Sequence, residues 1–327
     1  MQLTINNTAV EIREGETILE AARRVGYTIP SLCYAPGARH KSSCMVCAVR
    51  NTANGQIIPS CTTYPTDGMQ IDTENEEVKL VRTLSLELLL SDHKADCEAP
   101  CSMVCPKGLD VERMLAYYDT GEMEKAHLLI AAAFALPEVG CTDCKAPCEK
   151  ACRRGSIDQA VAIREIIQDV IARSTETPGQ EGQPIPKNDK NQYYSRLGRF
   201  TAKEKERLKE TVTTPSRCLH CACAGRTDCK LRRYATAEGI KRPRYEASTA
   251  LPVMEKQQIS EHLWFEPAKC IRCGLCVYNS TNGFTFQDRG FGMQVVLPEA
   301  NRSHIGDEFA ALCPTGAIYL KENESWK

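Results

Sequence analysis

The chain has 327 residues and a net charge of −1, so its composition argues against two classes of partner before any motif is considered. A charge this close to zero predicts neither nucleic acid nor an anionic membrane as a partner. The first residues lack a basic segment followed by an apolar run, and the longest apolar stretch, residues 128–136, is far too short to span a bilayer. We therefore expect a cytoplasmic protein.

The nineteen cysteines are the most informative part of the composition. In a reducing compartment so many cysteines indicate metal binding rather than disulfide bonds, and their number is odd. Aromatic residues make up only 6% of the chain, which argues against one large core. Small modules stabilised by bound metal fit better, because metal binding contributes free energy of folding. We expect a modular α+β protein.

Residues 1–75 are predicted to form the first module. Alternating residues predict strands over 2–6 and 9–13, and apolar residues at helical spacing predict a helix over 16–25. Further strands are expected over 46–50 and 56–58. This order is typical of a small β-grasp domain. It contains a first group of cysteines: Cys33, Cys44, Cys47 and Cys61.

The sequence around this group resembles a known cluster-binding domain. The segments IPSLCYAPG, SSCMVCAV and PSCTTYPTDGM are similar to the N-terminal domain of the complex I large iron–sulfur subunit and of the matching subunit of NAD-linked hydrogenases. The resemblance implies a [2Fe-2S] cluster bound by these four cysteines. A structural zinc site is the alternative, and the β-grasp pattern that precedes the cysteines argues against it.

Residues 76–175 are predicted to form a helical domain. An amphipathic helix is expected over 76–93, and a helical region from 109 to 174 ends in a helix over 157–172. Two further groups of possible ligands belong to this domain. They are His93, Cys97, Cys101 and Cys105, followed by Cys141, Cys144, Cys148 and Cys152.

Two resemblances assign these ligands to two [4Fe-4S] clusters. VRTLSLELLLSDHKADC resembles the complex I segment in which a histidine and three cysteines bind a cluster, although the spacing then departs. CSMVCPKGLD and GCTDCKAPCEKACRRG resemble the helical domain of the glutamate synthase small subunit. Together they imply one cluster bound by Cys105, Cys144, Cys148 and Cys152, and another bound by His93, Cys97, Cys101 and Cys141. Alternatively, His93 is an exposed residue that favours the helix dipole.

Residues 176–216 are predicted to be a linker followed by a charged helix over 201–212, and a cysteine module is expected over 217–245. Four cysteines within twelve residues must bind one ion or one cluster. A [4Fe-4S] cluster and a zinc ion both remain open for this set, since zinc also takes four thiolates. We expect His220 to be a solvent-facing spacer. The cysteines are Cys218, Cys221, Cys223 and Cys229.

Residues 260–327 are predicted to form the last module. KCIRCGLC and the later ALCPTGAI resemble a ferredoxin [4Fe-4S] module. Because VYNSTNG follows in place of a cysteine for a second cluster, the module is expected to bind a single cluster. Its implied ligands are Cys270, Cys273, Cys276 and Cys313.

The chain has no dinucleotide-binding motif, since Gly290 and Gly292 are not followed by a helix. We therefore expect neither flavin nor NAD in this chain and no catalytic site of its own. The resemblances imply an electron-transfer subunit between an NADH-oxidising flavoprotein with FMN and a second oxidoreductase, such as a hydrogenase or a formate dehydrogenase. The alternatives are a stand-alone multi-cluster ferredoxin-like carrier and an iron–sulfur regulator.

Overall fold

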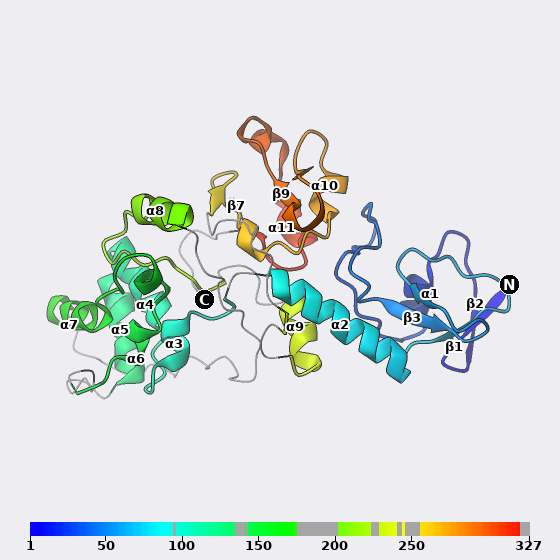
Figure 1. The fold of residues 1–327 in the computed structure, drawn as a ribbon, viewed down its shortest axis with the longest axis horizontal. Coiled ribbons are helices and arrows are strands. Elements are labelled where there is room, and N and C mark those ends of the chain that lie inside the picture. The colour runs from blue at the N-terminus through cyan, green and yellow to red at the C-terminus, as the bar shows by residue number, and fades with distance from the viewer. Residues whose placement is uncertain are drawn as a thin grey trace. The chain divides into compact units, whose positions relative to one another are not determined.

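The computed structural model is a mixed α+β protein (Figure 1). It divides into two compact units: a first unit of Met1–Lys94 with Gly225–Asn323, and a second unit of Ala95–Ala224 with Glu324–Lys327. The central part of the predicted linker, 176–191, lies outside the residues that the structure describes. Those residues are 1–93, 96–134, 141, 143–174, 202–223, 229–240, 244–245 and 256–320.

The first unit begins with a five-stranded sheet in the order β2-β1-β5-β3-β4. The β1–β2 hairpin turns at Asn6 and Asn7, whose φ values of 45° and 69° suit a tight hairpin turn. β1 pairs in parallel with β5, which was not predicted because it has three residues and only Ile71 is buried. The other four strands confirm the predicted ones. The strands are β1 (Gln2–Ile5), β2 (Thr8–Glu11), β3 (Ala48–Asn51), β4 (Ile57–Pro59) and β5 (Gln70–Asp72).

Helix α1 (Ile18–Arg24) confirms the predicted helix over 16–25. It begins with a capping box, in which Thr17 and Glu20 each bond the other's backbone N–H. The free N–H groups of its first turn donate to two carbonyls of the loop after β4, those of Ser60 and Thr63. The helix start is therefore bonded directly to the segment that carries Cys61.

Helix α2 (Glu76–Asp92) confirms the predicted amphipathic helix, and Asn75 caps its N-terminus. The buried Arg82 donates from Nε and Nη2 to the carbonyl of Ala48, at 3.0 and 2.7 Å. This holds α2 against β3, beside Cys47. On the other side α2 packs against α9 (Lys230–Ala237), as Figure 1 shows.

The last part of the first unit is a small α+β module. A sheet in the order β10-β7-β6 and the hairpin β8–β9 enclose a core that includes Phe265, Phe284 and Phe309. As expected, Gly290 and Gly292 belong to a short 3₁₀ turn rather than a helix. The elements are β6 (Gln257–Gln258), β7 (Leu263–Phe265), η2 (Pro267–Lys269), α10 (Leu275–Asn279), β8 (Thr285–Gln287), η3 (Gly290–Gly292), β9 (Gln294–Val296), η4 (Glu299–His304), α11 (Glu308–Leu312) and β10 (Ile318–Leu320).

The second unit is helical in the residues described, with Met114, Ile130 and Ile163 in its core. The helix predicted over 157–172 begins only at Ile163. Before it, the buried Arg154 of a 3₁₀ turn bonds Asp158 through two 2.7 Å contacts, which favours a turn there. The elements are α3 (Pro100–Val104), α4 (Val111–Thr120), α5 (Met123–Ala133), α6 (Pro147–Lys150), η1 (Arg153–Ser156), α7 (Ile163–Arg173) and α8 (Ala202–Thr211). No described helix of either unit is long and apolar enough to cross a membrane.

Candidate metal centres

All nineteen cysteines are free thiols. Among the described residues, no three His, Cys, Asp or Glu side chains lie close enough to hold a single metal ion. An iron–sulfur cluster is a larger object, whose separate iron corners each take one thiolate. The cysteines fall into four neighbourhoods, within each of which the thiols influence one another.

The first neighbourhood unites all four cysteines predicted for the N-terminal domain. Cys33, Cys44, Cys47 and Cys61 are 1%, 6%, 1% and 0% exposed, so water is excluded from their sulfurs. Cys33, Cys44 and Cys47 belong to the segment between α1 and β3, and Cys61 follows β4. The sheet and α1 thus bring one loop and one distant residue to the same point.

These four thiols are connected by hydrogen bonds that shift their pKa values. Hydrogen bonds from Cys44 and Cys61 lower the pKa of Cys33, and the same bonds raise the pKa values of Cys44 and Cys61. A hydrogen bond with Cys61 lowers the pKa of Cys47 to about 7. Buried thiols that compete for protons around one centre are well placed to exchange them for metal, because metal binding releases thiol protons. The set therefore fits a [2Fe-2S] cluster.

Backbone contacts hold the loops that carry these thiols. Ser60 donates from Oγ to the carbonyl of Cys47 at 2.7 Å, and His40 Nε2 lies 2.9 Å from the carbonyl of Cys61. Met45 lies between two of the cysteines with a φ of 53°, a left-handed conformation that turns the loop sharply. The thiols are therefore positioned by their surroundings before any metal binds.

The second neighbourhood unites the four cysteines predicted for the C-terminal module. Cys270 follows η2, Cys276 belongs to α10 and Cys313 ends α11. Burial raises the pKa of Cys270 to about 12 and raises those of Cys273 and Cys276 well above the usual value, and the charge of Cys313 adds to each. Thiols this desolvated ionise readily only beside a cation, which fits a metal cluster.

The loop of this module has a conformation suited to wrapping a cluster. Arg272 has a φ of 56°, and its N–H donates to the sulfur of Cys270 at 3.3 Å. Gly274 follows with a φ of 79°, and a Cβ there would lie 2.6 Å from the Tyr278 ring. Only glycine fits this position, because any side chain would meet both the ring and an unfavourable backbone conformation.

The two neighbourhoods of the first unit are linked by reciprocal hydrogen bonds. The backbone N–H of Arg39 donates to Asn279 Oδ1 at 2.9 Å, and Asn279 Nδ2 donates to the backbone carbonyl of Arg39 at 2.7 Å. Arg39 belongs to the N-terminal cysteine loop, and Asn279 lies three residues after Cys276. The charge of Cys33 contributes to the raised pKa of Cys273, so the two sites are electrostatic neighbours.

The third neighbourhood lies in the second unit, where α3 packs against α6. Burial raises the pKa of Cys141, and the charges of Cys105 and Cys144 raise it further. Burial likewise raises the pKa of Cys148 to about 11, with contributions from Cys105 and Cys141. Cys105, Cys141 and Cys148 therefore influence one another electrostatically, and the ligand set predicted with Cys152 stays a prediction.

The fourth neighbourhood includes cysteines from three of the predicted groups, namely those of Cys101, Cys152 and Cys218. Burial raises the pKa of Cys101, and the largest neighbouring charges are those of Cys218, Cys221 and Cys152. Burial also raises the pKa of Cys221, again with contributions from Cys218 and Cys152. Cys97 lies in the same unit, and its carbonyl accepts a hydrogen bond from the N–H of Cys223 at 3.3 Å.

Two predicted ligands lie in the first unit instead. His93 ends α2 and is 7% exposed, so the alternative of an exposed helix-end residue is wrong. Cys229 is buried at the start of α9, and the next residue, Lys230, donates its N–H to Pro314 at 2.9 Å. Of the predicted 217–245 module, Cys218, Cys221 and Cys223 thus belong to the second unit and Cys229 to the first.

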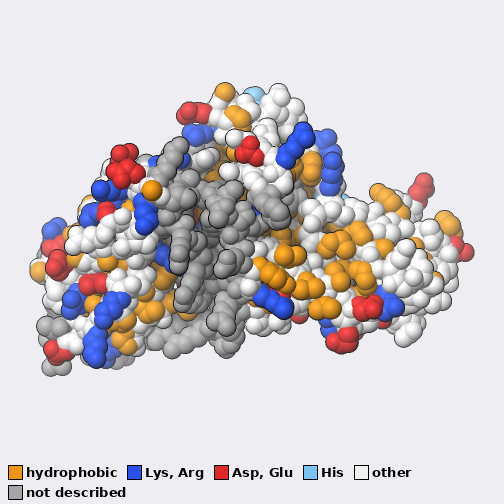
Figure 2. Space-filling view, viewed as in Figure 1, with side chains coloured by type: hydrophobic (Ala, Val, Ile, Leu, Met, Phe, Trp, Pro, Cys, Tyr) orange, Lys and Arg blue, Asp and Glu red, His pale blue; other side chains and the backbone are white. Residues whose placement is uncertain are grey.

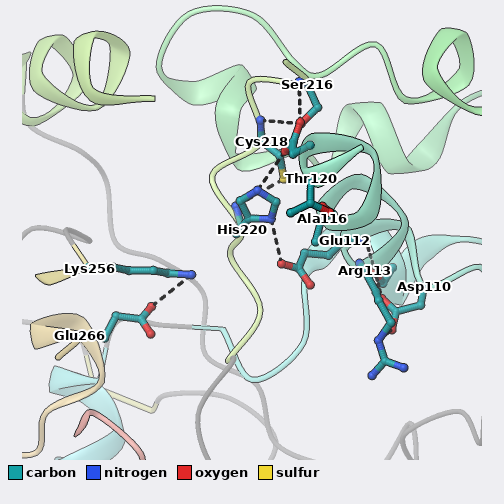
Figure 3. A network of polar contacts seen from close by, with 12 residues as sticks. Asp110, Glu112, Arg113, Ala116, Thr120, Ser216, Cys218, His220, Lys256 and Glu266 are labelled. Atoms are coloured by element: carbon teal, nitrogen blue, oxygen red, sulfur yellow. Dashed lines mark hydrogen bonds and ion pairs between the residues drawn. The ribbon is translucent and has the colours of Figure 1, made fainter. Parts of the chain in front are cut away.

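His220 is not the solvent-facing spacer that was predicted. Its Nδ1 lies 3.2 Å from Glu112 Oε1 (Figure 3). Its Nε2 lies 3.0 Å from Asp119 Oδ2. Burial alone would lower the pKa of His220, but the bonds with Asp119, Cys218 and Glu112 outweigh it and raise the pKa to about 12. The imidazole is therefore positively charged at neutral pH. The signal missed was the spacing of Glu112 and Asp119, seven residues apart on one helix face.

Comparison with known proteins identifies two cluster-binding domains. Residues 1–76 match a 2Fe-2S iron–sulfur cluster binding domain. Residues 80–178 match domain II of dihydropyrimidine dehydrogenase, a 4Fe-4S cluster domain. The chain therefore carries a [2Fe-2S] domain followed by a [4Fe-4S] domain, in the order that the sequence predicted.

The relatives found among curated proteins are components of oxidoreductases. The NADP-reducing hydrogenase subunit HndD of Solidesulfovibrio fructosivorans is 36% identical over 44% of this chain and 26% of its own length. A component of the NADH-quinone oxidoreductase of Rhizobium meliloti is 32% identical over 37% of this chain and 14% of its own length. The alpha subunit of the NADPH-Fe(3+) oxidoreductase of Geobacter sulfurreducens is 30% identical over 39% of this chain and 14% of its own length. The chain thus matches about a quarter or less of each relative's length.

A solved structure also shares the fold. A chain of an NAD⁺-reducing [NiFe]-hydrogenase in the H₂-reduced state matches with a TM-score of 0.52 at 18% identity, over 100% of this chain and 89% of that one. Identity this low supports a similar fold and no more. The two matched domains bind redox clusters, and the relatives are components of oxidoreductases. The chain therefore carries two iron–sulfur cluster domains and is similar over part of its length to components of oxidoreductases.

Proposed function

We propose that the chain relays single electrons between a flavoprotein subunit that oxidises NADH or NADPH and a second oxidoreductase of the same complex. The observation that carries the proposal is the reciprocal bonding of Arg39 and Asn279, which joins the N-terminal cysteine loop to the helix that bears Cys276. Two buried thiol sets held together in one unit suit the transfer of an electron from one to the other.

The flavoprotein follows from the chemistry of the donor. Iron–sulfur clusters exchange single electrons, whereas a nicotinamide delivers a hydride, so a flavin such as FMN must convert between the two. The three relatives are named for NADP, NADH and NADPH. By analogy we assign a nicotinamide as the donor or acceptor of the flavoprotein, and a hydrogenase, a formate dehydrogenase or a similar enzyme as the far partner.

We assign the clusters from the neighbourhoods of the thiols. The N-terminal domain, with a β-grasp arrangement, would bind one [2Fe-2S] cluster through Cys33, Cys44, Cys47 and Cys61. One [4Fe-4S] cluster would be bound by Cys270, Cys273, Cys276 and Cys313, and another by Cys105, Cys141, Cys144 and Cys148. The second of these sets revises the predicted ligands by one residue, because the charge of Cys105 contributes to the raised pKa of Cys141.

The surface of the chain supports protein partners. Figure 2 shows Lys and Arg interspersed with Asp and Glu on the face in view, and hydrophobic side chains gathered where Figure 1 draws α2. Leu80 and Leu88 of α2 are 59% and 56% exposed. Exposed apolar side chains on a helix with polar neighbours are typical of a surface that binds another protein.

The iron content tests the number of clusters. Protein reconstituted anaerobically should contain about 10 irons per chain from the three clusters assigned above, and about 18 if all five cysteine groups of the sequence bind clusters, two from one [2Fe-2S] cluster and sixteen from four [4Fe-4S] clusters. Zinc in place of one [4Fe-4S] cluster would lower the iron by about four and add one zinc. Elemental analysis of iron, zinc and acid-labile sulfide measures this, and fewer than about ten irons would contradict the multi-cluster proposal.

The flow of electrons tests the relay. The chain alone should not oxidise NADH or NADPH with an artificial acceptor, because we expect it to hold no flavin that could accept a hydride. A tagged chain purified from its native cells should bring a flavin-containing subunit with it. Within that complex one of the two nicotinamides should reduce the clusters of this chain, seen as bleaching of their visible absorbance.

The control for the relay is the same complex with Asn279→Ala. It removes the link between the two sites of the first unit and touches none of the assigned ligands. It should leave flavin reduction and the iron content unchanged and slow the bleaching. Rapid bleaching of the chain alone by a nicotinamide would overturn the proposal. Reduction of the flavin without any bleaching would show that electrons enter the complex through another subunit.

A further inference from the structure

The segment 216–223 is firmly bound to the helical domain. Ser216 donates to Asp119 from both its N–H and its hydroxyl, each at 2.7 Å. The imidazole of His220 contacts Glu112, as Figure 3 shows, and also Asp119 on the same face of α4. Both acids are almost fully buried, at 6% and 4% side-chain exposure, so they anchor the segment away from solvent.

The segment has the local conformation of a cluster-binding loop. His220 has a φ of 48° and its N–H donates to the sulfur of Cys218 at 3.3 Å. In the ferredoxin-like module, Arg272 has a φ of 56° and its N–H donates to the sulfur of Cys270, also at 3.3 Å. Both are the second residue after the first cysteine of a Cys-x-x-Cys pair. The two pairs therefore turn alike, and both sulfurs accept the backbone bond that stabilises a thiolate.

The segment turns its cysteines toward the helical domain. Cys218 and Cys101 belong to the same buried core, and Cys152 and Ala222 pack against it. Farther along, the N–H of Cys223 donates to the carbonyl of Cys97. Arg153, next to Cys152, forms an ion pair with the fully buried Asp96 at 3.1 Å. Cys97, four residues before Cys101, is therefore bonded to the segment, and Arg153, next to Cys152, is paired with the residue that precedes Cys97.

We infer that Cys218 and Cys221 complete a four-thiolate site with Cys101 and Cys152, and that this site binds a [4Fe-4S] cluster. The inference rests on the proposed function only in that the helical domain binds clusters of this type. It replaces the expected separate module, in which Cys218 and Cys221 would share one ion or cluster with Cys223 and Cys229. His220 is a positioning residue for the site, because its bonds to α4 hold the turn between the two cysteines.

The inference is tested by counting irons in single and double variants. After anaerobic reconstitution, Cys101→Ala and Cys221→Ala should each lose about four irons and the same signal in the electron paramagnetic resonance spectrum. The double variant should lose no more than either single variant, because both changes remove the same cluster. If the two cysteines served different clusters, the double variant would lose about eight irons, and the inference would be overturned.

Cys223→Ala is the matched control, since it lies two residues from Cys221 in the same loop. It should keep the signal that Cys101→Ala removes, whereas a separate Cys218 module would require Cys223→Ala to remove the Cys221 signal instead. Cys221→Ser guards against simple misfolding, because serine keeps the size of the side chain. It should retain the circular dichroism of the native fold while altering the same signal. An unaltered signal in this variant would contradict the inference.

These readouts separate the inference from the relay. An iron loss that is shared by Cys101→Ala and Cys221→Ala supports the ligand set even if no nicotinamide reduces the complex. Additive iron losses overturn the ligand set and leave the proposed relay standing, because the other clusters still connect the partners.

Discussion

Cys47→Ala is expected to abolish the [2Fe-2S] cluster completely and to lower the iron content by about two per chain. Cys47 is 1% exposed, and a hydrogen bond with Cys61 lowers its pKa to about 7, so its thiol is buried and interacts with another predicted ligand of the cluster. Electron paramagnetic resonance of the reduced protein, together with iron analysis, measures the loss.

Ser42→Ala is the control for this prediction. Ser42 is an exposed residue of the same loop, two positions before Cys44. It should keep the full [2Fe-2S] signal, because its side chain contributes nothing to the buried sulfurs. In the flavoprotein complex, Cys47→Ala should also block reduction of the remaining clusters. Normal reduction without the [2Fe-2S] cluster would show that electrons bypass the N-terminal domain.

Glu266→Gln is expected to destabilise the C-terminal module by about 3–5 kcal/mol, because it removes the carboxylate from a buried ion pair. The side chains of Glu266 and Lys269 are 3% and 0% exposed, and Lys269 Nζ donates to Glu266. The ammonium, 5.7 Å from the centre of the Tyr319 ring, would lose this buried carboxylate. Lys269 precedes Cys270 directly, so the cluster of this module should be lost at a lower urea concentration.

Glu261→Gln is the matched control, because Glu261 lies 3.7 Å from His262 with 80% of its side chain exposed. A surface pair of this kind contributes about 0–1 kcal/mol, so the urea midpoint should barely move. The double variant Glu266→Leu with Lys269→Met should recover most of the lost stability, since it removes both charges and leaves apolar side chains of similar size. A Glu266→Gln protein as stable as the native one would show that the ion pair contributes nothing.

Much of the local structure could be predicted from the sequence. The hairpin, α1, α2 and α8 each depend on residues within a few positions, such as the Thr17–Glu20 capping box. The Cys-x-x-Cys pairs could be recognised for the same reason, because each places two thiols on one turn. The two cysteine sets of the first unit could be grouped from the sequence because three of the four cysteines in each belong to one short segment, and their role as cluster ligands stays a prediction.

The sequence could not group the remaining cysteines. Cys141 and Cys152 stand on either side of Cys144 and Cys148 in the sequence, and nothing in their spacing says which one belongs with Cys105. In the folded chain the charge of Cys105 contributes to the raised pKa of Cys141. Strand β5 was not predicted, because its three residues are too few to show an alternating pattern and form a strand only by pairing with β1 and β3.

The sequence by itself indicated a [2Fe-2S] domain followed by a [4Fe-4S] domain, since cysteines at ligand spacing carry that information locally. Only the tertiary structure decided which distant residues meet. In it Arg39 is hydrogen-bonded to Asn279, 240 positions away, and His220 to Glu112, 108 positions away. Such contacts arise when separate elements bury their apolar faces together, and no short segment encodes which faces will pair.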